Sequence, residues 1–213
     1  MPRLRLRSDD GMTLLELLIS MTVLTVVLTI VTVVLVGFQK VYVKENDRTQ
    51  TNDQARLAVE ELDREVRSGN VLYDPALEND PGHDIYPGMS LRIYTQSNAN
   101  SRPGFRCVQW RIDGAGELEN RNWWTNWRDD PTHLVSGWRT VADHVVNRSD
   151  SPQVPAFALD TSDPSYGSRL VNVTIVVNQN AKSGQDLTVK SAVEGRDTTF
   201  GYPSSACADI PPY

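Results

Sequence analysis

The clearest feature of the hydrophobic pattern is a long apolar stretch near the N-terminus. Residues 17–39 contain no charged residue. A helix of about 20 apolar residues crosses a hydrocarbon core of about 30 Å. A secretory signal has a shorter apolar core followed by a small-residue cleavage site, whereas Phe38 is followed here by Gln-Lys-Val-Tyr. The pattern therefore predicts that residues 12–39 form a transmembrane helix that stays attached to the mature protein. The alternative is the buried core helix of a soluble protein, which seldom runs this long without a charge.

The helical pattern continues beyond this stretch but changes character. Residues 40–69 are polar at first, and apolar residues then recur at intervals of three and four, at Ala55, Ala58, Val59, Leu62 and Val66. This spacing predicts one apolar stripe on an amphipathic helix, with i,i+4 pairs of opposite charge on its exposed face. Ser68-Gly69-Asn70 predicts the end of the helix, because glycine readily adopts the left-handed conformation that terminates helices. We expect one helix from Met12 to Ser68.

The rest of the chain alternates between strand and turn signals. A tight connection is expected at Asp113–Gly116, and the segment from Asn147 to Gly167, rich in Ser, Pro and Asp, is expected to be a long loop. The last ten residues, with two prolines, are expected to form an irregular tail. Period-two alternation of apolar and polar residues predicts strands over residues 90–95, 105–112, 117–127, 169–177 and 187–193.

These patterns predict an α+β fold, because the strands follow the helix instead of alternating with it. Residues 70–213 should form a β-rich globular head of antiparallel strands. The amphipathic stripe of residues 40–69 should pack against this sheet.

Charge narrows the range of functions. The formal net charge is −6, from 21 Lys and Arg against 27 Asp and Glu. Binding to duplex nucleic acid needs a basic face, so such a partner is not expected. Basic residues flank the apolar stretch on both sides, so the positive-inside rule does not fix its orientation: Arg3, Arg5, Arg7, Lys40, Lys44 and Arg48.

The chain contains two cysteines, Cys107 and Cys207, both in the polar part. If that part is exported, a disulfide between them is expected, because such bonds persist in oxidising compartments. The bond would close a loop of about 100 residues, which the chain-entropy treatment values at up to roughly 4–5 kcal/mol. Two buried free thiols are the alternative.

A short motif stands at the start of the apolar stretch. Gly11 is followed by Met12-Thr-Leu-Leu-Glu16 and then by the continuous apolar run. An unpaired carboxylate in hydrocarbon costs roughly a few kcal/mol, so the position of Glu16 needs a reason; snorkelling of its carboxylate toward the lipid headgroups is the simple one. The motif resembles the class III signal of type IV pilins and type II secretion pseudopilins. Their pattern is a short basic leader ending in glycine, then Phe-Thr-Leu-(Leu/Ile)-Glu and about twenty apolar residues.

The resemblance implies a pilin-like fold and a processed precursor. Residues 1–11 would be a leader, cut by a prepilin peptidase between Gly11 and Met12 on the cytoplasmic side, with methylation of the new amine. Glu16 would pair with the N-terminal amine of a neighbouring subunit as helices stack into a filament, since charges attract strongly away from water. The implied partners are the peptidase, other pilin or pseudopilin subunits and, before assembly, membrane lipid. No cofactor and no catalytic residue are implied.

Four departures from the family pattern point to a minor component. Met12 replaces the usual phenylalanine, and Asp9-Asp10 precede Gly11 where a basic residue is usual. Thr25 and Val33 stand where many major pilins carry a helix-loosening glycine and proline. The fourth departure is the absence of the short two-cysteine loop of major pilins.

Similarity to minor pilins and J-type minor pseudopilins extends along the chain to residues 54–68, 108–113, 116–118, 123–124, 171–177 and 187–196. The resemblance therefore implies a minor pilin or pseudopilin that helps to initiate or cap a filament, first in the cytoplasmic membrane with its head outside the cytoplasm, then in a pilus or pseudopilus.

Three other functions have candidate residues in the sequence. For an enzyme, His83, His133 and His144 stand in no HExxH or GxSxG motif and beside no cysteine at a useful spacing. For a membrane-anchored binding module, Trp123, Trp124 and Trp127 could stack on sugars or on bases of single-stranded DNA; the alternative is that those facing inward are buried against the long helix. For calcium, the loops 78–84 and 160–163 gather carboxylates without the EF-hand spacing, so we expect no metal site.

Overall fold

The computed structural model describes residues 12–97, 104–150, 152–162, 169–179, 185–196 and 202–212. The expected leader, residues 1–11, which ends at Gly11, lies outside the described residues. The chain divides into two compact units, residues 1–46 and 47–213. Helix α1, Leu14–Ser68, contributes residues to both.

Helix α1 begins two residues later than predicted and ends at the predicted residue. In the first unit every residue from Met12 to Asn46 is exposed. The helix is long and apolar enough to cross a membrane, and none of the residues in its most apolar stretch is buried. An apolar surface of this extent needs an apolar environment supplied from outside the chain.

The head contains two antiparallel sheets. The larger has five strands in the order β1 (Gly69–Leu72), β2 (Ser90–Ser97), β3 (Gly104–Ile112), β4 (Leu118–Trp124) and β5 (Arg139–Ala142). The smaller has three, in the order β6 (Phe157–Leu159), β7 (Leu170–Val177) and β8 (Leu187–Glu194). Three short 3-10 helices, η1 (Pro75–Leu77), η2 (Pro81–His83) and η3 (Trp127–Asp129), and helix α2 (Pro131–Leu134) complete the described elements.

The turn between β3 and β4 requires glycine at one position. Gly116 has φ +82°, and a Cβ atom there would lie 2.7 Å from the carbonyl oxygen of Val145. The Gly116 N–H closes the turn on the carbonyl of Asp113 at 3.3 Å, and the Val145 N–H donates to the Gly116 carbonyl at 2.8 Å. Any other residue would be strained by its φ and would collide with the following segment.

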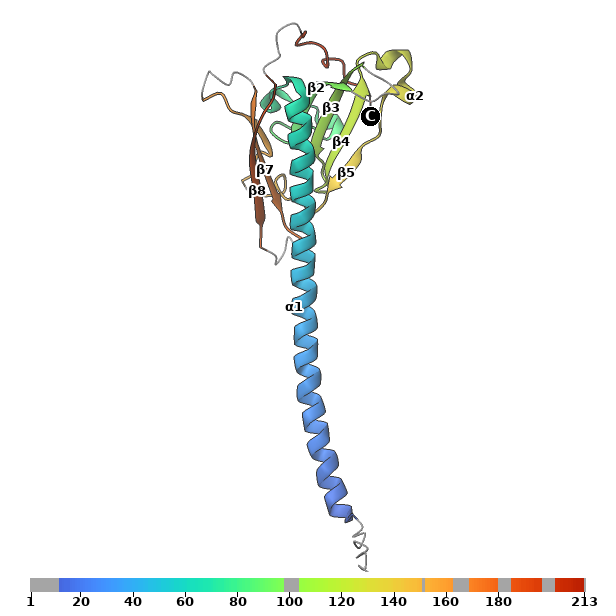
Figure 1. The fold of residues 1–213 in the computed structure, drawn as a ribbon, viewed down its shortest axis with the longest axis vertical. Coiled ribbons are helices and arrows are strands. Elements are labelled where there is room, and N and C mark those ends of the chain that lie inside the picture. The colour runs from blue at the N-terminus through green and yellow to red at the C-terminus, as the bar shows by residue number, and fades with distance from the viewer. Residues whose placement is uncertain are drawn as a thin grey trace, which may run out of the picture. The chain divides into compact units, whose positions relative to one another are not determined.

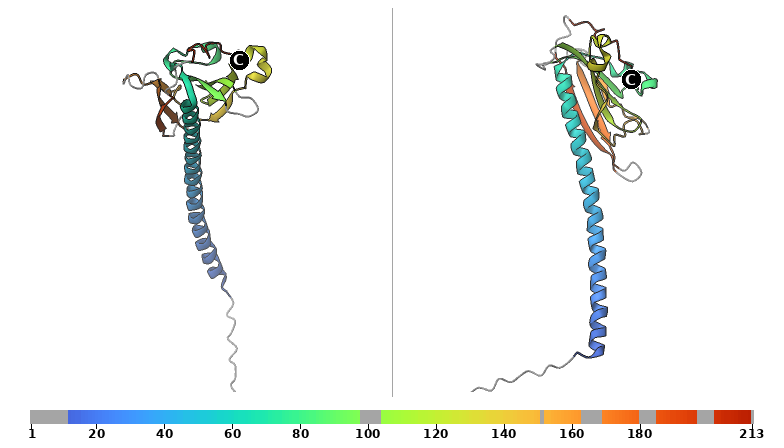
Figure 2. Two further views of the ribbon diagram at one scale, coloured as in Figure 1. Left: turned by 45° about the horizontal axis from the view of Figure 1, so that its top comes forward. Right: turned by 90° about the vertical axis from the view of Figure 1, so that its right-hand side faces the viewer.

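The main core lies where the second part of α1, residues 47–68, meets both sheets (Figures 1 and 2). The predicted stripe is confirmed, because all five of its residues are buried: Ala55, Ala58, Val59, Leu62 and Val66. They pack with alternate residues of β2, β3 and β4, among them Ile93, Trp110 and Leu118, and with residues of β6, β7 and β8 such as Phe157, Val173 and Val193. The α+β prediction is therefore confirmed.

The opposite face of the five-stranded sheet carries a second, smaller cluster, which we call the outer cluster. Its buried members are Tyr94, Cys107, Trp123, Trp127 and Cys207. Because side chains alternate along a strand, Cys107 and Trp123, which are paired across β3 and β4, point away from the face that carries Val108 and Leu118. The outer cluster contains no residue of α1.

Several boundaries differ from the sequence prediction. The strand expected over residues 117–127 ends at Trp124, because the chain then turns into η3. Strands β1 and β5 were not predicted, and β6 lies inside the stretch expected to be a long loop. These three strands have three or four residues each, too few for an alternation to be recognised.

Candidate functional site

The candidate site is the N-terminal end of α1, where Thr13 and Glu16 lie. The backbone N–H of Glu16 donates to the Thr13 hydroxyl at 3.3 Å, and the N–H of Leu17 donates to the Thr13 carbonyl at 3.2 Å. Thr13 is thus the N-cap, satisfying one of the amides that a helix end leaves unpaired. Thr-x-x-Glu is also the spacing of a capping box, a signal that the sequence reasoning missed.

Glu16 lies in the first turn of α1, where the partial positive charge of the helix N-terminus favours a carboxylate. Its immediate neighbours are apolar and solvent-facing: Met12 is 71% exposed, Leu14 83% and Leu15 69%. Glu16 is the one charged residue between Met12 and Gln39. The end of the helix therefore presents one acid group on an otherwise apolar surface.

Hydroxyl residues further along the apolar part donate to their own helix. The acceptors are backbone carbonyls three or four residues earlier, at 2.7–2.8 Å, for the hydroxyls of Ser20, Thr22, Thr25, Thr29 and Thr32. Such bonds satisfy the hydroxyl proton without any partner outside the helix. The polar atoms of these side chains are therefore compatible with a lipid environment.

The two cysteines are bonded in the structure. Cys107 on β3 and Cys207 near the C-terminus are joined with a Cα–Cα distance of 5.8 Å, within the usual range for a disulfide. The bond lies in the outer cluster, beside Trp123.

The tryptophans are placed differently from the sequence expectation. Trp123 is fully buried and Trp127 is 7% exposed, both in the outer cluster and not against α1. Trp124 is half-buried and covers Gly104, its ring carbon lying 3.2 Å from where a Cβ would stand. Neither Trp123 nor Trp127 offers an open ring face to a sugar or a base.

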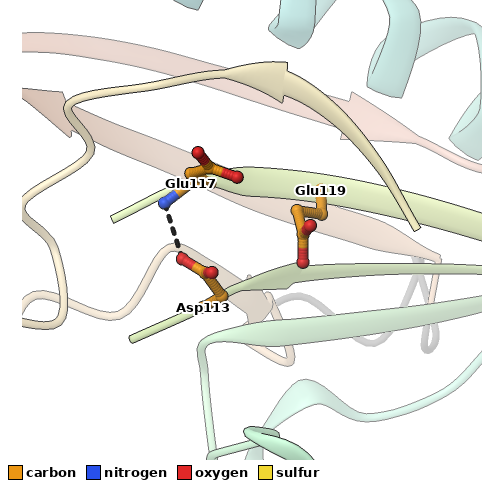
Figure 3. A group of neighbouring side chains, drawn as sticks. All are labelled: Asp113, Glu117 and Glu119. Atoms are coloured by element: carbon orange, nitrogen blue, oxygen red, sulfur yellow. Dashed lines mark hydrogen bonds between the residues drawn. The ribbon is translucent and has the colours of Figure 1, made fainter. Parts of the chain in front are cut away.

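One group of neighbouring acidic side chains was not predicted from the sequence. The carboxylates of Asp113, Glu117 and Glu119 lie within 4.8 Å of one another (Figure 3). Asp113 accepts the backbone N–H groups of Ala115 and Glu117 at 2.9 and 2.8 Å, and Glu119 accepts from Arg111 at 2.9 Å. The group is engaged in closing the β3–β4 turn and in an ion pair.

In the two candidate calcium loops, each of the described carboxylates Glu78, Asp80, Asp84 and Asp160 has a protein partner of its own. Glu78 pairs with Arg92 at 2.6 Å, Asp80 with His83 at 2.8 Å, and Asp84 with Arg148 at 2.5 Å. Burial raises the pKa of Glu78, although Arg92 opposes this. For Asp84 partial burial raises the pKa, but hydrogen bonds from Arg148 and the Gly114 N–H outweigh it and lower the pKa overall. In the other loop, Asp160 accepts from Ser162 and Asn172, and Asp163 lies outside the described residues.

The three histidines lie far from the end of α1 in sequence, each beside an aspartate. The partners are Asp80 for His83, Asp130 for His133 and Asp143 for His144. All three histidine side chains are 42% exposed or more, as expected for solvated surface pairs.

A polar hollow of about 210 Å³ lies between α1 and the sheet, lined by Glu61, Glu65, Arg106, Val108, Asn120, Arg121, Asn122 and Arg139. Glu65 pairs with Arg106 at 2.9 Å, and Glu61 pairs with Arg139 and accepts from Asn120. These contacts join the helix to β3, β4 and β5. These contacts could not be predicted from local sequence patterns, because they pair residues 41 or more positions apart.

Comparison with protein families gives one match. Residues 6–32 match the prokaryotic N-terminal methylation motif, which includes Gly11, Thr13 and Glu16. No match was found among curated proteins or among solved structures. The motif and the exposed apolar part of α1 together indicate a single-pass membrane-anchored protein. The chain therefore carries a class III signal like that of type IV pilin and pseudopilin prepilins.

Proposed function

We propose that this protein is a minor pilin or minor pseudopilin, a non-catalytic structural subunit. After prepilin peptidase cleavage between Gly11 and Met12, it enters a type IV pilus-like filament and helps to initiate or cap it. Before assembly it resides in the cytoplasmic membrane with its head outside the cytoplasm. Its partners are the peptidase, membrane lipid and other pilin or pseudopilin subunits.

The observation that carries this proposal is Glu16 at the end of an exposed apolar helix. All residues from Met12 to Asn46 are exposed, and a lone carboxylate there is costly in lipid. A neighbouring subunit's N-terminal amine would neutralise it, and the attraction of the two charges is much stronger in an apolar medium than in water. The arrangement thus favours association of helices in one register.

The minor role rests on the departures of the sequence from the major-pilin pattern. Thr25 and Val33 lie inside an uninterrupted α1, at positions where many major pilins carry glycine and proline. Cys107 and Cys207 are separated by 100 residues, unlike the short two-cysteine loop of major pilins. Because Glu16 is present, the subunit is expected to have a neighbour whose amine it can neutralise, so in a capping complex with other minor subunits it would not be the terminal one.

Processing is tested by intact mass and N-terminal sequencing of the full chain produced with and without a prepilin peptidase. We expect a mature chain that starts at methylated Met12 only when the peptidase is present. Gly11→Ala should block this cleavage. A chain that keeps Met1 under every condition would contradict the proposal and leave residues 17–39 as an ordinary signal anchor.

Assembly is tested separately with Glu16→Gln, which removes the charge and keeps the side-chain size. In cells that contain the other filament subunits, the variant should be processed but should be lost from the sheared filament fraction. Asp53→Asn is the matched control, because Asp53 is an exposed acid on the same helix outside the apolar stretch. Equal recovery of Glu16→Gln and Asp53→Asn in filaments would count against the role of Glu16.

The alternative of a ligand-binding module finds less support. Trp123 and Trp127 are buried in the outer cluster, so alanine at either position is expected to destabilise the head. A loss of sugar or single-stranded DNA binding with the head still folded would favour the module instead.

A further inference from the structure

The C-terminal segment lies over the outer cluster and is fastened at several points. We call residues 202–212 the strap. The N–H of Cys207 donates to the Tyr73 hydroxyl at 2.8 Å, and Arg92 donates to the carbonyl of Cys207 at 2.9 Å. Arg128 donates to both carboxylate oxygens of Asp209, at 2.5 and 2.6 Å. The disulfide to Cys107 is the covalent tie.

The strap completes the outer cluster and takes no part in the main core. Cys207 is a buried member of the cluster, and Tyr202, Ala206 and Ile210 pack against it. The main core is built from α1 and the strands of both sheets and includes no residue of the strap. The packing of α1 on the sheets therefore does not use the strap, whereas Trp123 and Trp127 are covered with its help.

Apart from the disulfide, the strap is held by scattered polar contacts and by the ring contacts of Tyr202 with Tyr94 and Phe105. Within residues 202–212 only Cys207 and Pro211 are buried, and the ion pair between Arg128 and Asp209 is largely solvent-exposed, at 70% and 48% of the two side chains. The preceding strand, β8, ends at Glu194. Segments with few buried contacts open locally without global unfolding. The disulfide therefore determines how much of the time the strap is seated on the outer cluster.

We propose that Cys107 and Cys207 form a redox lock on the strap. With the two thiols reduced, the head folds around α1 and the two sheets while the strap remains unseated and the outer cluster is open. On reaching an oxidising compartment, thiol–disulfide exchange with a disulfide-containing donor forms the S–S bond. The two thiols lose two electrons and two protons, and the donor leaves as a dithiol. The bond then seats the strap and buries Trp123.

This lock would distinguish a reduced head from the oxidised head that forms outside the cytoplasm. Disulfides persist outside the reducing cytoplasm and are rare within it, so the closed outer face would form only on exported heads. The inference rests on the disulfide and the two separate clusters, and it holds whether or not the protein enters a filament.

The test is hydrogen–deuterium exchange of the full chain in detergent micelles, with and without a phosphine reductant, after a thiol assay of each sample. Reduction should lower the protection of the hydrogen-bonded strap amides, those of Ala206, Cys207 and Ala208, by about 100-fold or more. Amides of residues 55–66 and 105–112 should keep their protection. The tryptophan emission should shift to longer wavelength, because Trp123 and Trp127 become hydrated.

The variant Cys107→Ser/Cys207→Ser should reproduce the reduced pattern without any reagent. Asp209→Asn in the oxidised chain is the control, because it removes an exposed ion pair of the strap and leaves the covalent tie; its strap should stay protected. Two outcomes would overturn the lock. If the strap keeps its protection after reduction, the bond does not control it. If residues 55–66 lose protection as well, the disulfide supports the whole head and not the strap alone.

Discussion

The two parts of α1 share one secondary structure but differ in what surrounds them. In residues 14–46 the side chains are apolar on every side over most of the length, and all of them are exposed. In residues 47–68 one stripe is apolar, and this stripe is buried against the two sheets of the head. The same helix thus finds an apolar partner inside the chain for its second part only.

The difference shows which information each part carries. A helix that is apolar all round needs an apolar partner from outside the chain. Its side chains therefore determine which surroundings the helix requires, such as lipid or neighbouring helices. An amphipathic helix specifies a docking face, and its contacts stabilise the fold by burial of about 25 cal/mol per Å² of apolar surface. Substitutions should therefore affect membrane or filament behaviour in the first part and head stability in the second.

The largest effect is expected from Leu62→Ala in the second part. Leu62 is 1% exposed in the main core, and truncating a buried leucine costs about 2–5 kcal/mol. Denaturant unfolding of the head should show this loss. Leu57→Ala is the matched control, since Leu57 lies on the same helix but is 63% exposed; it should change the stability little. Equal losses for both variants would mean that the stripe does not dock α1.

A smaller effect of a different kind is expected from Leu28→Lys near the centre of the apolar part. A lysine at the middle of a membrane-spanning helix costs about 2.5–3.5 kcal/mol of insertion free energy. The fraction of chain that resists alkaline extraction from membranes should fall, while the unfolding midpoint of the head stays the same. Leu57→Lys should leave extraction unchanged. A normal membrane-integrated fraction for Leu28→Lys would remove the distinction between the two parts.

The polar border of the docking face should contribute less. Glu61 pairs with Arg139 and accepts from Asn120, but the Arg139 side chain is 56% exposed, so solvent screens the pair. We expect Glu61→Gln to cost about 1 kcal/mol of head stability. Glu60→Gln, at an exposed position one residue earlier, should cost less. If the two variants are equally stable, the ion pairs add nothing to the apolar stripe.

Loss of the N-cap should be felt only at the start of the helix. Thr13→Ala removes the hydroxyl that accepts the Glu16 amide, at a cost of about 0.5–1 kcal/mol. Amide exchange in residues 14–17 should quicken in micelles, with no change in the head. Thr13→Ser keeps the hydroxyl and should behave as the unmodified chain. Faster exchange in Thr13→Ser too would show that the methyl group, not the cap, is what matters.

The smallest effect is expected from a contact that involves neither part of α1. A hydrogen bond from Arg128 lowers the pKa of Asp209, so the contribution of this pair to stability is present above the ordinary aspartate pKa. It is lost as the pH falls through the lowered value. The melting temperature of Asp209→Asn should be slightly below that of the unmodified head at neutral pH. The two should converge in strong acid, and a constant offset would exclude a role for the charge.

The sequence predicted the parts of the fold that depend on local periodicity. Leu62 and its stripe could be located because a helix repeats every 3.6 residues, and Thr13 and Glu16 could have been recognised as a cap by the same local reasoning. The position of Trp123 could not be found in this way. Alternation shows that Trp123 and Asn122 point to opposite faces, but which face is covered depends on Cys207, 84 residues further along the chain.

The same limit explains the contacts of Glu61 and Glu65. On the helix they are flanking positions that look like ordinary solvated acids. Their partners, Arg139 and Arg106, come from strands whose order is set by the sheet and not by the helix. β5, which supplies Arg139, has four residues and carries no recognisable pattern of its own.

The hydroxyl bonds within the apolar part of α1 have a consequence for how the helix is perceived by its surroundings. Five hydroxyl groups already donate hydrogen bonds to backbone carbonyls of the same helix, those of Ser20, Thr22, Thr25, Thr29 and Thr32. A lipid chain or a neighbouring helix therefore meets mainly methyl and methylene groups there. Although the printed sequence of this segment contains several polar residues, their hydroxyl donors are used within the helix, and its surface behaves as an apolar one. Against that background Glu16 is the one charge between Met12 and Gln39, and an approaching subunit has a single electrostatic landmark by which to align.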